Sequence, residues 1–241
     1  MGLVRRSGIV RDHALARFSP RPKRQSAIRK YFAQGSIDYI ENTAGVLESR
    51  ENAVELALEF QNADRVSVGY SDYLEALPAP LFIGGIMVPV GSYNFGAVRA
   101  GYNMGQQRAL SANITIEHGT FYNGRKTTFG IARGRALVTT QLSVEPTYSI
   151  NKVELDQGRF TTHLLGARTT YTATPLMFVS ALVQFNSTTH SVSTNARFRW
   201  EYLPGSELFV VYNEDRNTLV QDRSNLAGRS FIVKMNRLLR F

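Results

Sequence analysis

The sequence predicts an all-β fold, an antiparallel up-and-down transmembrane β-barrel of which about 13 strands are present. Three observations predict it: apolar residues recur at every second position, many alternating segments are long, and charged residues fill the positions between the apolar ones. A period of two is that of a strand, whose successive side chains point to opposite faces. A membrane strand needs about nine to eleven residues, whereas strands of soluble proteins average about five or six.

The alternation is clear around residue 56, where Val54, Leu56 and Leu58 alternate with Glu55 and Glu59. Similar alternation continues along most of the chain, and clusters of Gly, Pro, Asn, Asp and Ser interrupt it. The expected strands lie near residues 3–18, 27–42, 47–61, 64–76, 93–104, 107–119, 124–133, 136–149, 159–173, 176–187, 193–203, 206–215 and 229–241.

Length and composition indicate one folded domain, residues 1–241, with 43% hydrophobic and 20% charged residues. The 28 Lys and Arg residues exceed the 19 Asp and Glu residues, for a formal charge of +9. That balance suits nucleic acid, anionic headgroups or an anion-attracting pore. The basic residues near the N-terminus are scattered and lack a nucleic-acid-binding motif, so no nucleic-acid partner is expected. The absence of cysteine excludes thiolate nucleophiles and disulfides.

The most apolar piece outside the expected strands is Leu81 to Gly91, which Gly84, Gly85 and Pro89 interrupt. No window holds 18 consecutive apolar residues, so a helical membrane protein is not expected. Two interpretations of this piece stay open. It folds over or into the mouth of the barrel, or it is a strand extension bent at glycine.

The last expected strand, Arg229 to Phe241, ends on an aromatic residue, and its apolar residues at odd positions are expected to point outward, toward lipid. This resembles the C-terminal signal by which the outer-membrane barrel assembly machinery recognises its substrates. The register also turns Arg237 toward lipid, where an arginine near the interface is tolerated because its stem reaches the headgroups. A rival interpretation is an edge strand of a soluble sandwich. The residues of the expected signal are Phe231, Val233, Met235, Leu239 and Phe241.

The connections near the C-terminus are expected to alternate in length, as in barrels with short periplasmic turns and longer external loops. Placing the C-terminus in the periplasm of a Gram-negative bacterium puts the longer connections outside. Tracing the alternation back gives an odd strand count, so we expect an incomplete barrel that lacks N-terminal sequence, including an export signal. The short connections are 174–175 and 203–206, and the longer ones are 149–158, 187–192 and 215–228.

Positions on the inward parity carry several basic side chains, which indicates a wet, somewhat basic lumen. One hypothesis is a passage that favours anionic solutes. The other, which we favour, is that these arginines pair with carboxylates such as Glu201 and Glu207 across the strands. The basic residues expected in the lumen are Arg168, Arg197, Arg199, Lys234 and Arg240.

Aromatic residues near the expected strand ends predict a girdle at the level of the lipid headgroups, although aromatic residues are also common in strands generally. Outer-membrane lipids are therefore an expected partner. The girdle candidates are Tyr148, Tyr171, Trp200, Tyr202, Phe209 and Tyr212.

No catalytic, cofactor-binding or metal-binding residues are expected. The four histidines are dispersed, and no zinc-protease, nucleophile-elbow or phosphate-loop motif occurs. Glu55 and Glu59 share a face but lie about 13 Å apart along a strand, which is too far for a paired carboxylate site. The sequence therefore does not predict an enzyme.

Three segments near the C-terminus resemble an uncharacterised bacterial family, a domain of unknown function. They are residues 182–187, 195–200 and 204–214, and the resemblance extends over about 158–241. Members of that family resemble exported proteins in which a domain similar to family-9 carbohydrate-binding modules precedes a large outer-membrane barrel. The resemblance implies that this chain is the C-terminal part of such a barrel and raises uptake or handling of glycans or peptides. It implies no catalytic residues.

The sequence therefore favours a porin-like outer-membrane β-barrel protein in transport or surface substrate handling, with an anionic, glycan or peptide solute. Two rivals remain. The first is a soluble periplasmic β-sandwich that binds carbohydrate, which would share the alternation but not the long strands. The second is an outer-membrane barrel hydrolase, for which Asp215 and Asp222 are the residues to test.

Overall fold

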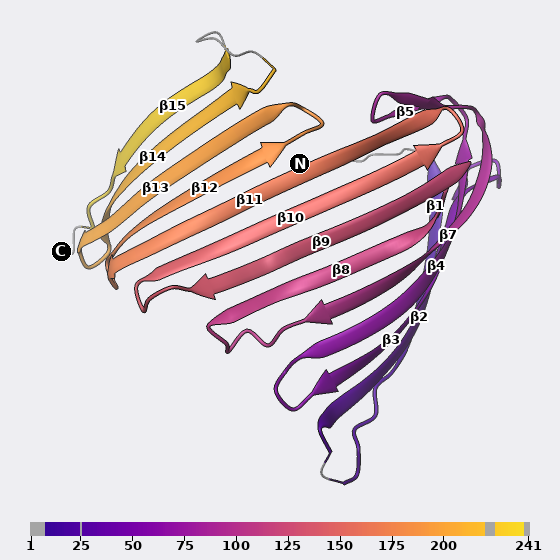
Figure 1. The fold of residues 1–241 in the computed structure, drawn as a ribbon, viewed down its shortest axis with the longest axis horizontal. Coiled ribbons are helices and arrows are strands. Elements are labelled where there is room, and N and C mark those ends of the chain that lie inside the picture. The colour runs from indigo at the N-terminus through magenta and orange to yellow at the C-terminus, as the bar shows by residue number, and fades with distance from the viewer. Residues whose placement is uncertain (1–7, 25, 220–224, 239–241) are drawn as a thin grey trace. The chain divides into compact units, whose positions relative to one another are not determined.

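The computed structural model describes residues 8–24, 26–219 and 225–238. These residues form an all-β protein in which 13 strands make one antiparallel sheet and two short strands make a separate hairpin (Figure 1). The strands of the large sheet are β1 Ile9–Phe18, β2 Ile28–Asn42, β3 Leu47–Phe60, β4 Arg65–Leu77, β7 Gly91–Asn103, β8 Leu110–Phe121, β9 Gly124–Leu137, β10 Leu142–Leu155, β11 Gly158–Thr174, β12 Met177–Asn186, β13 Ser191–Leu203, β14 Ser206–Asn217 and β15 Leu226–Met235.

Each strand of the large sheet is hydrogen-bonded to the strands next to it in the chain, with β4 followed directly by β7. The expected all-β class and the antiparallel sheet of 13 strands are confirmed. β1 and β15 stand at the two ends of the strand order, and no pairing that closes the sheet on itself is present among the described strands. The remaining two strands, β5 Leu81–Ile83 and β6 Ile86–Val88, pair only with each other.

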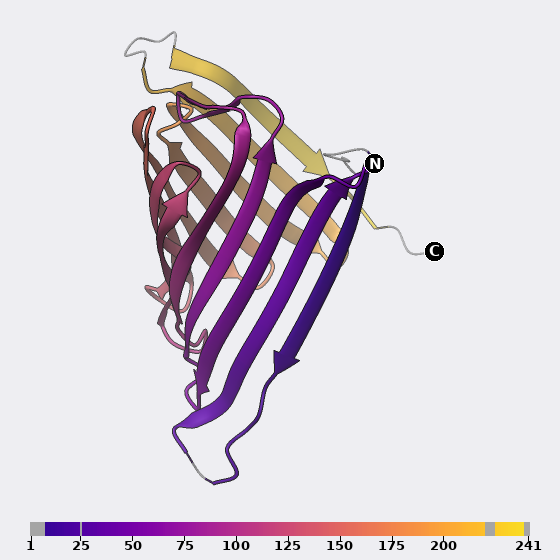
Figure 2. The same cartoon turned by 90° about the vertical axis from the view of Figure 1, so that its right-hand side faces the viewer.

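The chain forms two compact units, each of which is described by itself. In the first unit, β1 to β4 run side by side (Figure 2), and β7 pairs with β4. In the second unit, β12 to β15 run side by side. The first unit comprises residues 1–105, 114–129 and 151–161 and the second comprises residues 106–113, 130–150 and 162–241, so far as these are described.

In the first unit, the register gives the sheet one apolar face. Residues directly opposite each other on paired strands share a face. Leu56 is opposite Ala33 and Val68, and Val54 is opposite Tyr70. This face is exposed, and its large apolar side chains include Tyr31, Ile37, Val54, Leu56, Val66, Val68, Tyr70 and Val98.

The second unit also has an apolar face, built from β12 to β15. Val179 is opposite Phe198, which is opposite Val210, which is opposite Val233. The row crosses four strands without a charged residue, and Val179 and Val233 are exposed. The opposite parity of the same strands carries Arg197, Arg199 and Lys234, whereas Glu214, Arg216 and Arg229 lie on the parity of the apolar row, toward the ends of β14 and β15.

The β5–β6 hairpin covers the main hydrophobic cluster of the described residues. Val88 is fully buried and packs with Leu77, Val153 and Leu155, and Phe160 packs against the same cluster. The turn of the β5–β6 hairpin is Gly84-Gly85, with φ of 55° and 84°. Positive φ at both central residues is what a tight type I′ hairpin turn requires and what glycine allows.

This hairpin answers the question that the sequence left open for Leu81 to Gly91. The segment is a separate hairpin packed on side chains of β4 and β10 and is not a bent extension of a strand.

Several expected boundaries were wrong. β9 continues to Leu137 and β10 begins at Leu142, whereas the sequence predicted strands over 124–133 and 136–149. The connection expected at 149–158 is only residues 156–157, because β10 continues to Leu155 with Val153 and Leu155 buried in the cluster under the hairpin. At the other end, β15 begins at Leu226 and ends at Met235, whereas the sequence predicted a strand over 229–241. Leu238 leaves the ladder because its backbone N–H donates to Ser206 Oγ at 3.0 Å, beside the β13–β14 turn.

Candidate functional site

The charged face of the first unit is built from cross-strand ion pairs. Arg11 Nε donates to Asp38 Oδ1 at 2.8 Å between β1 and β2. Arg65 of β4 pairs with Glu55 of β3, and Arg65 also lies over the Phe32 ring, 4.7 Å from its centroid. Each pair joins two strands on one face, so the charges hold strands together while they stay in contact with water.

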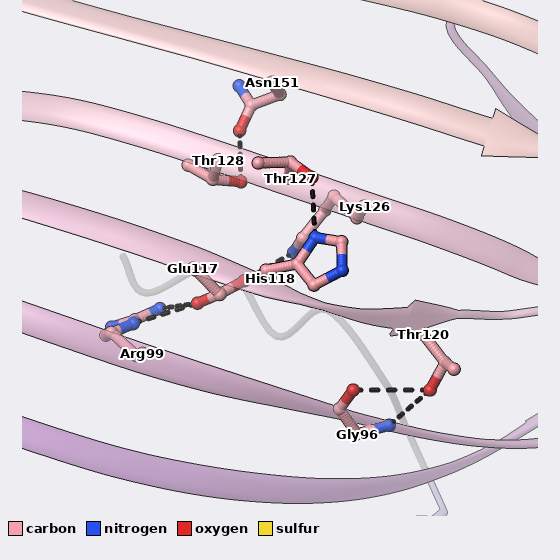
Figure 3. Close-up of polar contacts among 9 residues, drawn as sticks. All are labelled: Gly96, Arg99, Glu117, His118, Thr120, Lys126, Thr127, Thr128 and Asn151. Atoms are coloured by element: carbon pink, nitrogen blue, oxygen red, sulfur yellow. Dashed lines mark hydrogen bonds and ion pairs between the residues drawn. The ribbon is translucent and has the colours of Figure 1, made fainter.

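Glu117 of β8 joins three strands of this face (Figure 3). Arg99 Nε of β7 donates to Glu117 Oε2 at 2.9 Å, and Lys126 Nζ of β9 lies 2.9 Å from Glu117 Oε1. The Glu117 side chain is 12% exposed, whereas Arg99 remains 64% exposed. The carboxylate is thus the shielded centre of the network, and its two cations are the outer members.

Further hydrogen bonds join neighbouring strands near Glu117 (Figure 3). Thr128 Oγ1 donates to Asn151 Oδ1 at 2.9 Å, between β9 and β10. Thr120 Oγ1 accepts the backbone N–H of Gly96 at 2.8 Å, between β8 and β7. His118 Nδ1 lies 2.8 Å from Thr127 Oγ1.

At one end of this face, a group of aromatic rings packs next to the hairpin. Tyr122 contacts the rings of Tyr93 and Phe95, at centroid distances of 5.3 and 5.2 Å, and its hydroxyl donates to Glu75 at 2.8 Å. Burial, and then the Glu75 carboxylate, raise the pKa of the Tyr122 phenol well above its usual value. The hydroxyl therefore stays a donor at any physiological pH.

In the second unit, the register places the expected lumen residues on one face, opposite to the apolar face. Arg199 is opposite Phe209, which is opposite Lys234, and Arg197 is opposite Ser180. Arg168 of β11 is opposite Leu182 of β12 on the same parity. Arg240 lies outside the described residues.

Arg199 makes the cross-strand pairs that the pairing hypothesis expects. Its Nε donates to Glu207 Oε1 at 2.9 Å, and its Nη2 lies 3.7 Å from Glu201 Oε2. Among the described residues, Arg197 and Lys234 form no ion pair. The pairing hypothesis thus accounts for Arg199 and leaves the other basic residues of the face unexplained.

The residues of the expected C-terminal signal are partly described. Phe231 is opposite Tyr212 on the apolar face, and Val233 and Met235 follow it on the same parity. These three side chains are 57–68% exposed. Leu239 and Phe241 lie outside the described residues.

The six aromatic residues expected in a girdle do not lie at one level. Tyr171, Trp200 and Tyr202 lie near the ends of β11 and β13 that face the 175–176 and 204–205 turns, and the Trp200 and Tyr202 rings are in edge contact at 6.0 Å. Tyr148 and Tyr212 lie near the middle of their strands.

Phe209 lies on the other side of the sheet from Trp200. It is opposite Arg199 and Lys234 and therefore lies on the charged face. Its aromatic side chain and its place near the start of β14 favoured a girdle residue. Which face of the sheet it lies on, however, follows from the alternation of side chains along the strand.

The titratable groups of the described residues show no assembled metal site. No group of three or more His, Cys, Asp and Glu side chains in residues 8–24, 26–219 and 225–238 could hold a metal ion. His13 lies 3.5 Å from Asp38, which Arg11 already binds, and His163 lies 3.1 Å from the Tyr148 hydroxyl. In the same residues no helix is long and apolar enough to cross a membrane.

Sequence reasoning missed the network around Glu117 and the cluster under the hairpin. Glu117, Arg99 and Lys126 have the parity of the charged face, and that signal was readable. Which charges meet depends on the register between strands, which the alternation alone does not define.

Comparison with known protein families finds no matching family model, and comparison with curated proteins finds no match.

Proposed function

We propose that the chain is part of an outer-membrane β-barrel of a Gram-negative bacterium and serves in transport or surface handling of a solute. The observation that carries the proposal is the two-sided character of long strands. β2, β3 and β4 have 15, 14 and 13 residues, an exposed apolar face, and an opposite face of cross-strand ion pairs. A β-barrel with a lipid-facing exterior and a water-filled interior requires strands with one apolar face and one polar face.

The exposure of the apolar face argues against the soluble sandwich. In a sandwich, the apolar faces of two sheets pack about 10 Å apart and are buried. Val54, Leu56 and Val68 are 50–60% exposed instead. A continuous exposed apolar surface of this kind marks contact with a membrane or a partner.

The charged face supports a role with a polar solute. Its arginines and carboxylates would line water-filled space, and outer-membrane lipids would contact the other face. The exposed apolar parity of β15, with Phe231, Val233 and Met235, supports recognition by the barrel assembly machinery. The barrel-family resemblance of residues 158–241 adds glycans and peptides to the proposed solutes.

The single tryptophan provides the test. Trp200 lies on the apolar face of β13, opposite Met177 and Leu208. After refolding of the 241-residue chain into vesicles, phospholipids brominated on their acyl chains should quench Trp200 fluorescence, whereas aqueous iodide should quench it weakly.

A matched variant moves the fluorophore to the other face. The double substitution W200F/F209W places the tryptophan between Arg199 and Lys234. Iodide should then quench the emission and brominated chains should not. Equal quenching of the two proteins by iodide, or the absence of quenching by brominated lipid in both, would contradict the membrane location and favour the soluble sandwich.

A further inference from the structure

A hollow of about 450 Å³ opens on the charged face of the second unit. Arg133 and Arg135 of β9, Glu145 and Thr147 of β10, and Arg168 of β11 line it, and Leu182 and Gln184 of β12 complete one wall. Three of these side chains are arginines, so the lining brings three guanidinium groups together with a single carboxylate.

Two glycines lie where β9, β10 and β11 approach one another closely beside the hollow. Gly134 is buried, and a Cβ at this position would overlap the Pro146 carbonyl oxygen. At Gly166 a Cβ would lie 2.5 Å from Thr147 Oγ1, and Gly166 is directly opposite Gln184. A larger residue at either position would therefore push the neighbouring strand away and change the lining of the hollow.

The backbone of β9 is unusual at this hollow. Arg133 has φ of 49°, in the left-handed region. The other described non-glycine residues with positive φ, namely Ala63, Tyr122 and His190, lie in turns, whereas Arg133 lies within a strand. A non-glycine residue held there is strained, and such strain tends to persist where it positions a functional side chain.

The three arginines have no partner, unlike several other arginines of the sheet. Within the described part of the chain, Arg133, Arg135 and Arg168 form no ion pair or side-chain hydrogen bond, and neither does Glu145. Arg99 and Arg199, by contrast, each bind a carboxylate. The lining thus carries a formal charge of +2, with guanidinium donors left available to a ligand.

We propose that this hollow is a binding site for an organic oxyanion, a carboxylate or phosphate ester that also carries hydroxyl groups. The planar guanidinium fork matches the oxygens of either group in bidentate geometry. The Thr147 hydroxyl and the Gln184 amide supply neutral hydrogen bonds for hydroxyls, and Leu182 supplies an apolar wall. This site extends the proposed function, because it specifies that the solute is an anion. It rests on the proposed function, in which the charged face lines water-filled space.

Binding is measured by calorimetry on the refolded 241-residue chain in detergent. Glycerol 3-phosphate and glycerate serve as probes for the two oxyanions, and glycerol serves as the neutral control. At least one of the two anions should bind, and glycerol should not. Tighter binding of glycerol 3-phosphate would assign the site to phosphate esters, and tighter binding of glycerate would assign it to carboxylates. Binding of neither anion, or equal binding of glycerol, would overturn the proposal.

Substitutions locate the site. R135Q and R168Q should each weaken anion binding by about tenfold or more, since a charge-assisted hydrogen bond is lost. R197Q removes the same charge from the same face but outside the hollow, and should change the dissociation constant by less than about twofold. E145Q, which removes the single carboxylate, should strengthen binding.

The outcomes separate this proposal from the proposed membrane location. Equal losses in R168Q and R197Q would show a diffuse effect of charge and would overturn the site. A change in the circular dichroism spectrum of R168Q would indicate misfolding, and R168K is then the variant to compare. The lysine keeps the positive charge but lacks the planar guanidinium group. R168K should therefore bind the anion more weakly while its spectrum stays unchanged. Lipid quenching of Trp200 does not depend on the hollow, so either proposal can fail without the other.

Discussion

At the scale of single residues, the charges of the sheet differ in how far they are shielded from water. Glu117 is held between Arg99 and Lys126 and is 12% exposed, whereas the Lys152–Glu154 pair of β10 is more than 50% exposed at both partners. Ion pairs in water contribute little, because solvent screens them and the side chains lose freedom. Shielding therefore decides which pair matters for stability.

Substitution of Glu117 by Gln should lower the free energy of unfolding by about 1–2 kcal/mol. The amide keeps the shape of the side chain but leaves two cations next to each other without a counter-charge. Reversible urea unfolding in detergent, followed by tryptophan fluorescence, measures the change. In the control variant E154Q the unfolding midpoint should stay the same, and an equal loss in both variants would contradict the role given to shielding.

At the scale of elements, the β5–β6 hairpin is attached to the sheet by packing and not by ladder hydrogen bonds. Its turn glycines differ in surroundings, although both have positive φ. A Cβ on Gly84 would lie 2.5 Å from the Phe160 ring, and a Cβ on Gly85 would meet nothing within 4 Å. Alanine at position 85 therefore tests the backbone strain of the turn alone, whereas alanine at position 84 tests the strain together with the packing against Phe160.

Substitution of Gly85 by Ala should destabilise the hairpin by about 1 kcal/mol through backbone strain alone. Substitution of Gly84 by Ala should add about 1–3 kcal/mol more, because the methyl group overlaps the Phe160 ring. Amide hydrogen exchange in residues 81–88 measures both effects, and exchange should be fastest in G84A. Equal exchange rates in the two variants would mean that Phe160 does not hold the hairpin in place.

At the scale of the whole molecule, the sequence allowed prediction of the strands but not of their contacts. The expected segment 47–61 became β3, Leu47–Phe60, because alternation and turn residues are local signals. The end of β10 was missed, because Lys152 and Glu154 next to Asn151 resemble a loop unless the burial of Val153 is known. The hollow beside Arg168 was not predictable either, since it depends on glycines and arginines from neighbouring strands.

The proposed membrane location predicts opposite results for two neighbouring residues of β3. Val54 lies at the middle of the strand on the apolar face and is 58% exposed, and Ala53 lies at the same level on the other face, opposite Ser36 and Ser71. On a lipid-facing surface, V54R should lower the free energy of unfolding in vesicles by about 2–4 kcal/mol, the penalty for arginine near the middle of the bilayer. A53R should change it little, because Glu51 and Glu55 on the same face accommodate the charge. Urea unfolding in lipid vesicles compares the two variants. If both changed stability by less than about 0.5 kcal/mol, as exposed positions of a soluble protein do, the apolar face would not be in contact with lipid.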